Sequence, residues 1–350
     1  TAVLQDANTV RINEDDSVVT ADHIIVATGA SQRDIPGLPI DHETVITSRE
    51  ALELKDVPSR VVIVGGGATG CEFGYVWSTY GAEVTIVELM PRLIPNEDEE
   101  ISDQLKRSFK RQGIKSVTGA QAYITDILGG SAARVVISTD DSVQAEEYDK
   151  VLVAVGVQGN TAGIGLEAAG VQTDRGFIPV DDSMRTNVPN IYAIGDVTGK
   201  MLLAHVASAQ GVTAVECIAG LDPQPLDYVQ IPRAIYCRPQ VASFGLTEAQ
   251  AREQGYPVKV GRFPMAASGK ALAMNESEGM IKLVVDAEIG EILGAHMIGA
   301  EVTELLGELG MTKLLEATTT ELGWLVHPHP TISETLKEAA LAAEGEAIHI

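Results

Sequence analysis

The stretch RVVIVGGGATG at 60–70 constrains the fold of this chain more than any other. A short apolar strand runs directly into a GxGxxG pattern whose glycines are Gly65, Gly67 and Gly70, a helix is predicted after it, and a second strand, VTIVE, follows at 84–88. The first glycine permits a tight turn, the second lets the backbone approach a pyrophosphate, and the third lets helix and strand pack closely. The helix N-terminus presents N–H groups and a positive dipole end to the phosphates. The pattern predicts a βαβ unit that binds a dinucleotide.

Glu88 ends the second strand, 18 positions after Gly70. A carboxylate there can accept hydrogen bonds from both ribose hydroxyls and would repel a 2′-phosphate, which predicts NAD rather than NADP. Arg92 lies nearby in sequence and would soften that preference. The alternative is a purely structural βαβ unit with a surface glutamate. Glu72 lies one turn into the predicted helix, where simple dipole complementarity explains an acidic residue.

The remaining pattern indicates an α/β part followed by an α+β part. Short strand-like segments between residues 231 and 299 predict a largely antiparallel sheet, and helices are predicted at 301–318 and 331–344.

The charge balance disfavours nucleic acid and anionic membranes as general partners, because 25 Lys and Arg oppose 49 Asp and Glu. No apolar run approaches the roughly 18 residues of a membrane span, and the first residues do not resemble a signal peptide. We therefore expect a cytoplasmic protein. Cys71, Cys217 and Cys237 form no CxxC pattern, which argues against a metal site or a disulfide framework.

The segment VHPHPTISE at 326–334 contains two histidines that are candidate general bases. Pro330 rules out a regular helix through His329, while Thr331 can start one. Thr331 and Glu334 form T-x-x-E, a capping-box pattern in which the glutamate reaches back to a backbone N–H. From these residues alone, His327 and His329 are equally good bases and Glu334 is more simply a cap.

Four segments in one order, HIIVATGA, VVIVGGGATGCE, NIYAIGD and HPHPTISE, resemble the flavin- and NAD-dependent disulfide oxidoreductases over essentially all 350 residues. The last segment is most similar to the family members that oxidise dihydrolipoamide. The resemblance implies an α/β fold in which a Rossmann-like NAD-binding domain is inserted in the remainder of an FAD-binding domain. An α+β dimerisation domain with an antiparallel sheet follows. The expected parts are the remainder of the FAD-binding domain (1–45), the NAD-binding domain (46–160), the second FAD-binding part (161–225) and the dimerisation domain (226–350).

The resemblance also implies residues that hold FAD. Gly195 and Asp196 match a motif in which the aspartate bonds a ribityl hydroxyl, although a turn-capping aspartate would be the reading without the family. Ala204 and His205 match the segment beside the flavin ring. Gly156 is assigned to cofactor binding too, although VAVGVQGN departs from the VGRxPN that is common there.

By the same resemblance, His329 is the base that deprotonates a thiol and Glu334 orients its ring. Such a base is needed because the thiolate is the attacking species in thiol–disulfide exchange. In the family this histidine faces the disulfide and flavin of the other subunit, which implies a homodimer. Glu72 matches a glutamate near the nicotinamide and flavin.

The implied function is the oxidation of protein-bound dihydrolipoamide, with electrons passing through a disulfide and FAD to NAD, and with lipoyl domains of 2-oxoacid dehydrogenase complexes as partners. The family's first GxGxxG and its CxxxxC disulfide are not among these 350 residues, so we expect a truncated enzyme that can be inactive alone. One alternative is a related flavoprotein such as glutathione or mercuric reductase or a soluble transhydrogenase. Another is a non-catalytic NAD-binding and dimerisation fragment.

Overall fold

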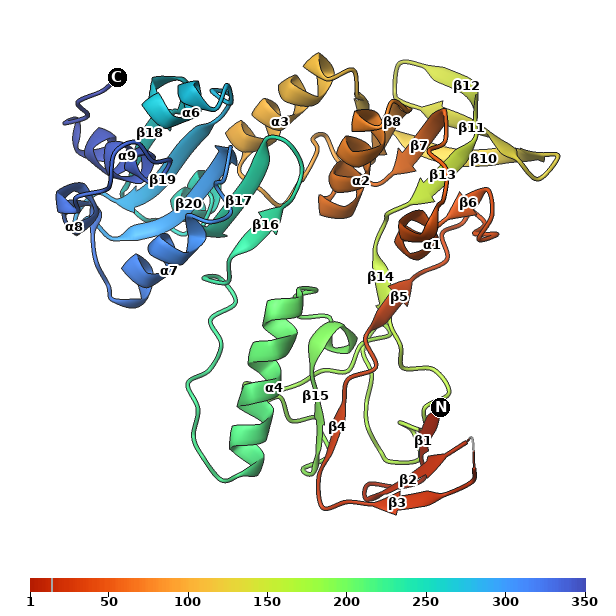
Figure 1. Ribbon diagram of the computed structural model, residues 1–350. Helices are drawn as coiled ribbons and strands as arrows, with labels where there is room; N and C mark the ends of the chain where they lie inside the picture. The colour runs from red at the N-terminus through yellow and green to blue at the C-terminus, as the bar shows by residue number, and fades with distance from the viewer. Residues whose placement is uncertain (14) are drawn as a thin grey trace. The chain divides into compact units, whose positions relative to one another are not determined.

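Two compact units make up the computed structural model, which describes residues 1–13 and 15–350 (Figure 1). The first unit comprises Thr1–Arg33 and Gly156–Tyr228, and the second comprises Asp34–Val155 and Val229–Ile350. Each unit is therefore built from two stretches of chain. The four-part division expected from the sequence remains a prediction.

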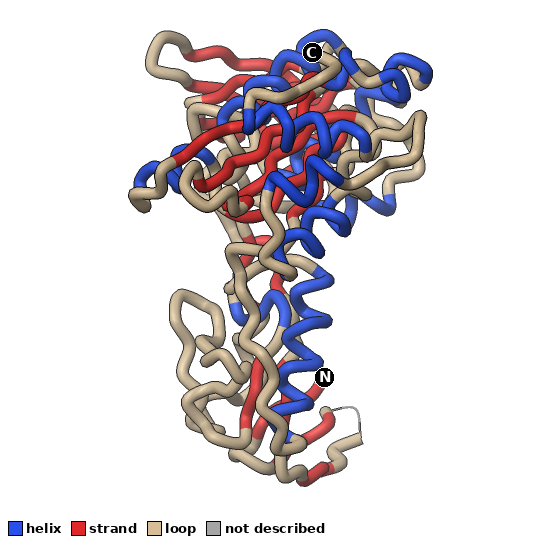
Figure 2. Tube along the Cα trace, turned by 90° about the vertical axis from the view of Figure 1, so that its left-hand side faces the viewer, coloured by secondary structure: helices blue, strands red, loops and turns tan. Residues whose placement is uncertain are grey.

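The first unit is assembled from short strands and one long helix. β1 (Ala2–Leu4), β2 (Thr9–Ile12) and β3 (Val18–Thr20) form an antiparallel sheet; β4 (Ile24–Val26) pairs in parallel with β15 (Ile191–Ala193), and β5 (Ala30–Gln32) pairs antiparallel with β14 (Val157–Gly159). A 3₁₀ turn, η1 (Gly195–Thr198), and α4 (Ala204–Ile218) follow β15. Figures 1 and 2 both show α4 beside β15, and buried Tyr192 of the strand packs against Ala214 of the helix.

The N-terminal part of the second unit is a parallel sheet with the order β6-β13-β7-β8-β9. Its strands are β6 (Val45–Ile46), β7 (Arg60–Val64), β8 (Glu83–Glu88), β9 (Lys115–Thr118) and β13 (Lys150–Val153), and its helices are α1 (Ser48–Glu53), α2 (Ala68–Thr79) and α3 (Glu99–Arg111). An antiparallel sheet of β10 (Gln121–Leu128), β11 (Ala132–Ser138) and β12 (Val143–Tyr148) accompanies it.

Alternate residues of β7 enter two different cores, which explains why the strand is apolar on both faces. Val61 and Ile63 join the core that contains Phe109 of α3, whereas Val62 and Val64 join the core that contains Val135 of β11. A parallel strand covered on both sides requires such a continuous apolar run. The βαβ unit predicted around the GxGxxG pattern is confirmed.

The C-terminal part of the second unit is an antiparallel sheet, as predicted, and its strand order is β16-β17-β20-β19-β18. The strands are β16 (Arg233–Ile235), β17 (Gln240–Gly245), β18 (Val258–Pro264), β19 (Met280–Asp286) and β20 (Ile292–Gly299). The helical segments are α5 (Glu248–Glu253), η2 (Met265–Ala267), α6 (Gly269–Ala273), α7 (Leu306–Leu314), α8 (Thr319–Trp324) and α9 (Glu334–Glu344). Figure 1 shows α9 beside β18, where a Cβ on Gly261 would lie 2.0 Å from the carbonyl oxygen of Ala339.

The two C-terminal helices are shorter than predicted. The helix expected over 301–318 spans only Leu306–Leu314, because Glu301 and Glu316 have left-handed φ angles of 56° and 55° that interrupt a right-handed helix. The helix expected from Thr331 begins at Glu334. Among the described residues, no helix combines the length and the apolar content needed to cross a bilayer.

Candidate functional sites

The three glycines of the GxGxxG turn differ in what a side chain would meet. Gly65 has φ of 114°, and a Cβ there would lie 2.4 Å from the carbonyl oxygen of Ala154. A Cβ on Gly70 would lie 1.9 Å from the carbonyl oxygen of Gly65, so helix and turn touch at this point. A Cβ on Gly67 would meet no other atom within 4 Å. The open side of Gly67, at the N-terminus of α2, therefore fits the approach of a pyrophosphate.

Glu88 lies at the end of β8 with its carboxylate held against this turn. Its Oε2 accepts a hydrogen bond of 2.6 Å from the N–H of Gly66, and its Oε1 accepts one of 2.8 Å from the N–H of Met90. The side chain is buried and its orientation is fixed by two backbone donors. Arg92 does not pair with Glu88 in this structure; its Nη2 donates to the carbonyl oxygen of Pro95 at 3.4 Å.

Glu72 connects α2 to the C-terminal part of the second unit. Its Oε1 accepts a hydrogen bond of 2.8 Å from the N–H of Tyr236, in the loop between β16 and β17. The sequence pattern did not reveal this contact, because the two residues are 164 positions apart. Glu72 thus has a structural partner in addition to the cofactor role implied by the resemblance.

Two buried cysteines flank this contact. Burial raises the pKa of Cys237 to about 12, and the carboxylate of Glu72 adds to the shift. Burial likewise raises the pKa of Cys71 well above its usual value. Both groups are therefore thiols at neutral pH and poor nucleophiles. Across residues 1–13 and 15–350, no cluster of three or more His, Cys, Asp or Glu side chains could hold a metal ion.

The residues assigned to FAD lie together in the first unit. Gly195 has φ of 73°, and its N–H donates to Oε1 of the buried Gln210 at 2.6 Å. Asp196 follows it in η1 and is half-buried. Ala204 and His205 begin α4 and are exposed, and the N-cap of α4, Leu203, makes no side-chain cap. The Asp196 carboxylate can accept hydrogen bonds from hydroxyl groups of a ligand. The uncapped N–H groups at the start of α4 can donate to its carbonyl oxygens.

Gly156 lies where β14 approaches β5. Its φ is 68°, and its carbonyl oxygen accepts a hydrogen bond of 2.7 Å from Nε2 of Gln32. In the structure, Gly156 therefore lies in the backbone just before β14, next to β5. Its role in cofactor binding remains a prediction.

Glu334 bonds the ring of His329 and a backbone N–H at the same time, with different oxygens. Oε1 lies 2.9 Å from Nδ1 of His329, and Oε2 accepts a hydrogen bond of 2.8 Å from the N–H of Thr331. The two readings of Glu334, as an orienting group and as a cap, are therefore compatible. The prediction that the Thr331 side chain caps the helix is wrong. Its hydroxyl donates to the carbonyl oxygen of Pro328 at 2.7 Å, and α9 begins only at Glu334.

Hydrogen bonding keeps Glu334 ionised. Burial acts to raise the pKa of Glu334, but the hydrogen bonds from the N–H of Thr331 and from His329 outweigh it and lower the pKa below its usual value. An ionised carboxylate accepts a hydrogen bond from Nδ1–H, so the neutral ring carries its hydrogen there and leaves Nε2 as the proton acceptor.

The structure separates the two histidines that the sequence left equivalent. The His327 side chain is only 4% exposed, and its Nε2 lies 2.8 Å from Oε1 of Glu308 on α7. The His329 side chain is 76% exposed. Only the second can reach a substrate directly.

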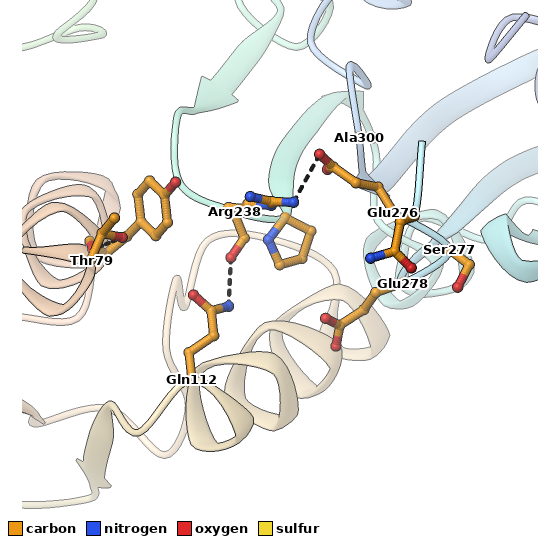
Figure 3. Close-up of a pocket in the computed structure, with 10 residues that line it drawn as sticks. Thr79, Gln112, Arg238, Glu276, Ser277, Glu278 and Ala300 are labelled. Atoms are coloured by element: carbon orange, nitrogen blue, oxygen red, sulfur yellow. Dashed lines mark hydrogen bonds and ion pairs between the residues drawn. The ribbon is translucent and has the colours of Figure 1, made fainter. Parts of the chain in front are cut away.

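A cavity of about 380 Å³ lies between α2, α3 and the C-terminal sheet (Figure 3). Gln112 of α3 donates to the carbonyl oxygen of Arg238 at 2.7 Å, and the guanidinium of Arg238 lies 3.0 Å from Glu276. None of the predicted site residues lines it.

Comparison with known proteins identifies the class. The family model of the pyridine nucleotide-disulphide oxidoreductases matches residues 1–211, and the model of that family's dimerisation domain matches residues 231–340. The chain is 50% identical over 345 residues to a dihydrolipoyl dehydrogenase of Chlorobaculum parvum, covering 98% of this chain and 74% of that protein. It is 44% identical over 338 residues to the dihydrolipoyl dehydrogenase of Bacillus subtilis, covering 96% of this chain and 71% of that protein.

Solved structures agree. The HOCl-induced flavoprotein disulfide reductase RclA of Escherichia coli has a TM-score of 0.86 at 28% identity, over 96% of this chain and 77% of that one. LpdA of Mycobacterium tuberculosis has a TM-score of 0.86 at 27% identity, over 97% of this chain and 75% of that one.

The chain belongs to the pyridine nucleotide-disulphide oxidoreductase family. Within the family, the prediction of an NAD-dependent flavoprotein disulfide oxidoreductase of the dihydrolipoyl dehydrogenase kind, with FAD and NAD as cofactors, is confirmed. The dimerisation domain supports a homodimer.

Proposed function

We propose that this chain carries the acid–base group and the NAD site of an enzyme that oxidises dihydrolipoamide. The observation that carries the proposal is the pair His329–Glu334, in which an exposed imidazole is held at 2.9 Å by a carboxylate that is itself anchored to the backbone of Thr331. A dithiol whose thiol groups have unperturbed pKa values is mostly protonated at neutral pH. One thiol must lose its proton before it attacks a disulfide.

His329 takes that proton at Nε2. Glu334 holds the ring by Nδ1, directs the hydrogen of the neutral ring to that nitrogen, and stabilises the imidazolium once it forms. When bound, FAD supplies two-electron transfer between a disulfide and NAD. In the dimer, His329 serves the disulfide of the other subunit.

The residues of the two nucleotide sites have distinct tasks in this proposal. Gly65, Gly67 and Gly70 shape the turn for the NAD pyrophosphate, while the buried Glu88 excludes a 2′-phosphate. Glu72 lies close to the nicotinamide end of the site. Asp196 bonds a ribityl hydroxyl of FAD next to Gly195, and Ala204 and His205 border the flavin ring with Gly156 at the junction. The partners are lipoyl domains of 2-oxoacid dehydrogenase complexes, in the cytoplasm.

Substrate discrimination in the intact holoenzyme tests this function. We expect NADH formation from dihydrolipoamide and NAD, with little activity when glutathione replaces the dithiol. NADP in place of NAD should lower kcat/KM by at least about tenfold, since a like charge beside Glu88 disfavours the 2′-phosphate. Equal rates with glutathione would reject the dithiol assignment, and equal rates with NADP would reject the role of Glu88. The measurement is initial-rate absorbance at the nicotinamide band.

The glycine turn offers a test of the NAD site alone. Gly67→Ala adds a methyl group where no atom lies within 4 Å, so folding should be unaffected, yet the methyl group enters the space assigned to the pyrophosphate. We expect NAD affinity to fall by about tenfold or more, roughly 1.4 kcal/mol, with Tm unchanged. Titration calorimetry and thermal melts measure both.

Gly307→Ala on α7 is the matched control, because its Cβ also meets nothing within 4 Å. NAD binding should be normal in this variant. Unchanged NAD affinity in Gly67→Ala would show that the pyrophosphate does not bind at this turn.

A further inference from the structure

Two histidine–glutamate pairs line one small cavity at the C-terminal end of the chain. The cavity has a volume of about 80 Å³, and its lining includes His329 with Glu334 and His349 with Glu338. Nδ1 of His349 lies 2.8 Å from Oε1 of Glu338. Glu334 and Glu338 are separated by four positions on α9, so their side chains project from the same face of the helix. The proposed function uses only the first pair.

The second pair is built like the first. Oε1 of Glu338 bonds the imidazole, while Oε2 accepts hydrogen bonds from the N–H groups of Ile348 and His349 at 3.0 and 3.2 Å. The glutamate side chain is 6% exposed and the histidine side chain is 68% exposed. The construction places a second exposed imidazole on a buried, anchored carboxylate.

The ionisation of Glu338 fixes the tautomer of His349. Burial acts to raise the pKa of Glu338, but hydrogen bonds from the His349 ring and from the two backbone N–H groups outweigh it and lower the pKa. Nδ1 of the neutral ring therefore carries the hydrogen, and Nε2 is the proton acceptor. Both imidazoles of the cavity thus bond a carboxylate through Nδ1.

Oxidation of a dithiol releases two protons, whereas one imidazole holds one proton at a time. Each dithiol has two S–H bonds, and once His329 holds the first proton it is an imidazolium that cannot accept the second. That proton must leave before the second thiol reacts.

We propose that the Glu338–His349 pair is a proton relay for His329. It receives, through water in the shared cavity, the proton that His329 takes from the first thiol, and it releases that proton to solvent. The cavity exceeds the roughly 10–15 Å³ that one water requires, and Glu334, Glu338 and Ser268 are among its polar lining residues. The inference rests on the proposed function and deepens it.

Protons and electrons balance in this scheme. The first S–H bond breaks, its proton goes to His329, and the thiolate attacks the redox disulfide that the family's activity supplies. The S–S bond of that disulfide breaks, a mixed disulfide forms, and one cysteine leaves as a thiolate. The relay returns His329 to the neutral form, and the second S–H bond then gives its proton to the same ring. The second thiolate attacks the mixed disulfide, closes the new S–S bond and displaces the other cysteine as a thiolate, so that the two electrons lost by the dithiol reside on the two cysteine thiolates and its two protons have gone to solvent.

The two pairs set the charge of the cavity. The other lining residues are uncharged: Phe263, Ala267, Ser268, Gly269 and Thr335. Lys259 lies on β18, the strand packed against α9, and is paired with Glu344 at 2.7 Å. Glu321 of α8 accepts hydrogen bonds from the backbone N–H and the hydroxyl of Thr318, the N-cap residue of that helix. Lys270 on α6 follows the lining residue Gly269 in sequence.

His349→Gln in the intact holoenzyme tests the relay, because it removes the imidazole and keeps the backbone N–H groups that bond Glu338. At low buffer concentration we expect kcat to fall by about tenfold, less than for loss of a primary base. Increasing concentrations of imidazole buffer should restore kcat. His42→Gln is the matched control, since it removes the ring from the His42–Glu50 pair, which has the same Nδ1–Oε1 geometry at 3.0 Å but lies outside this cavity.

The pKa of His329, measured by NMR in histidine-labelled enzyme without substrate, gives an independent readout. A protonated His349 would disfavour protonation of His329, so His349→Gln should raise the His329 pKa, whereas loss of the negative charge in Glu338→Gln should lower it. A normal kcat of His349→Gln at low buffer concentration would overturn the relay. So would a reduced kcat that imidazole does not restore, if the His329 pKa is also unchanged. If wild-type enzyme shows no dithiol turnover but the two opposite shifts occur, the proposed function fails while the coupling of the pairs stands.

Discussion

Replacing His329 by glutamine in the intact holoenzyme should lower dihydrolipoamide turnover by about 10²-fold or more, the usual scale for a lost acid–base catalyst. Glutamine fills a similar volume and can bond Glu334, but it cannot take a proton at pH 7. The exposure of the ring, 76% of its side chain, means that little packing is lost with it. Steady-state kinetics with dihydrolipoamide and NAD measure the effect.

The electron path from NADH to a small dye that accepts electrons without thiol chemistry should be almost unaffected in the same variant. This comparison separates a lost base from a damaged nucleotide site. His327→Gln is the companion variant, because its buried ring pairs with Glu308 and should affect stability more than turnover. Near-normal dithiol turnover in His329→Gln would reject the assignment of the base.

Replacing Lys282 by methionine should lower the free energy of unfolding by about 3–5 kcal/mol, the cost of leaving buried charge without its partner. Nζ of Lys282 on β19 lies 3.0 Å from both oxygens of Asp98, 2.6 Å from Glu100 and 3.0 Å from Glu248. The Lys282 side chain is 3% exposed, and that of Asp98 is 4% exposed. Methionine keeps the apolar stem but leaves these carboxylates facing one another. Urea unfolding monitored by circular dichroism measures the loss.

Arg134→Met is the control, because the Arg134–Glu147 pair is about half exposed on both sides and such surface pairs contribute little to stability. A loss in Lys282→Met no larger than this would show that the cluster is not a stabilising junction.

The pH dependence of the same cluster has a defined sign. Hydrogen bonding to Arg262, opposed by partial burial and aided by Lys282, lowers the pKa of Glu100 from 4.5 to about 2. The stability that Glu100 contributes is therefore complete above pH 4.5 and is lost as the pH falls toward 2. Burial acts to lower the pKa of Lys282, but its carboxylate partners outweigh it and raise the pKa above 10.5, so the contribution of Lys282 is lost only as the pH rises beyond that value. In Lys282→Met, the free energy of unfolding should therefore depend less steeply on pH between 4.5 and 2.

Local pattern was enough to predict the nucleotide-binding turn. Gly65, Gly67 and Gly70 fall in a six-residue pattern that specifies the turn, and the strand and helix that flank it follow from hydrophobic periodicity. The antiparallel sheet of the C-terminal part was predicted for the same reason, since alternation and turn residues are local signals.

Helix ends were less accessible to sequence reasoning. The left-handed residues Glu301 and Glu316 carry side chains that fit a helix well, and only the surrounding packing holds them at positive φ. Thr331 had the pattern of a cap, but its hydroxyl found Pro328 instead.

What the sequence by itself determined is the chemistry that the chain can offer: a dinucleotide turn, a carboxylate at the end of the next strand, and an imidazole with a carboxylate five positions away. What only the tertiary structure decided is which groups face one another. It buried His327 against Glu308, left His329 exposed, and brought His349 into the same cavity. It also placed Lys282 beside Asp98, 184 positions away. Such pairings depend on how helices and strands pack, and no local spacing encodes the distance between residues on different elements.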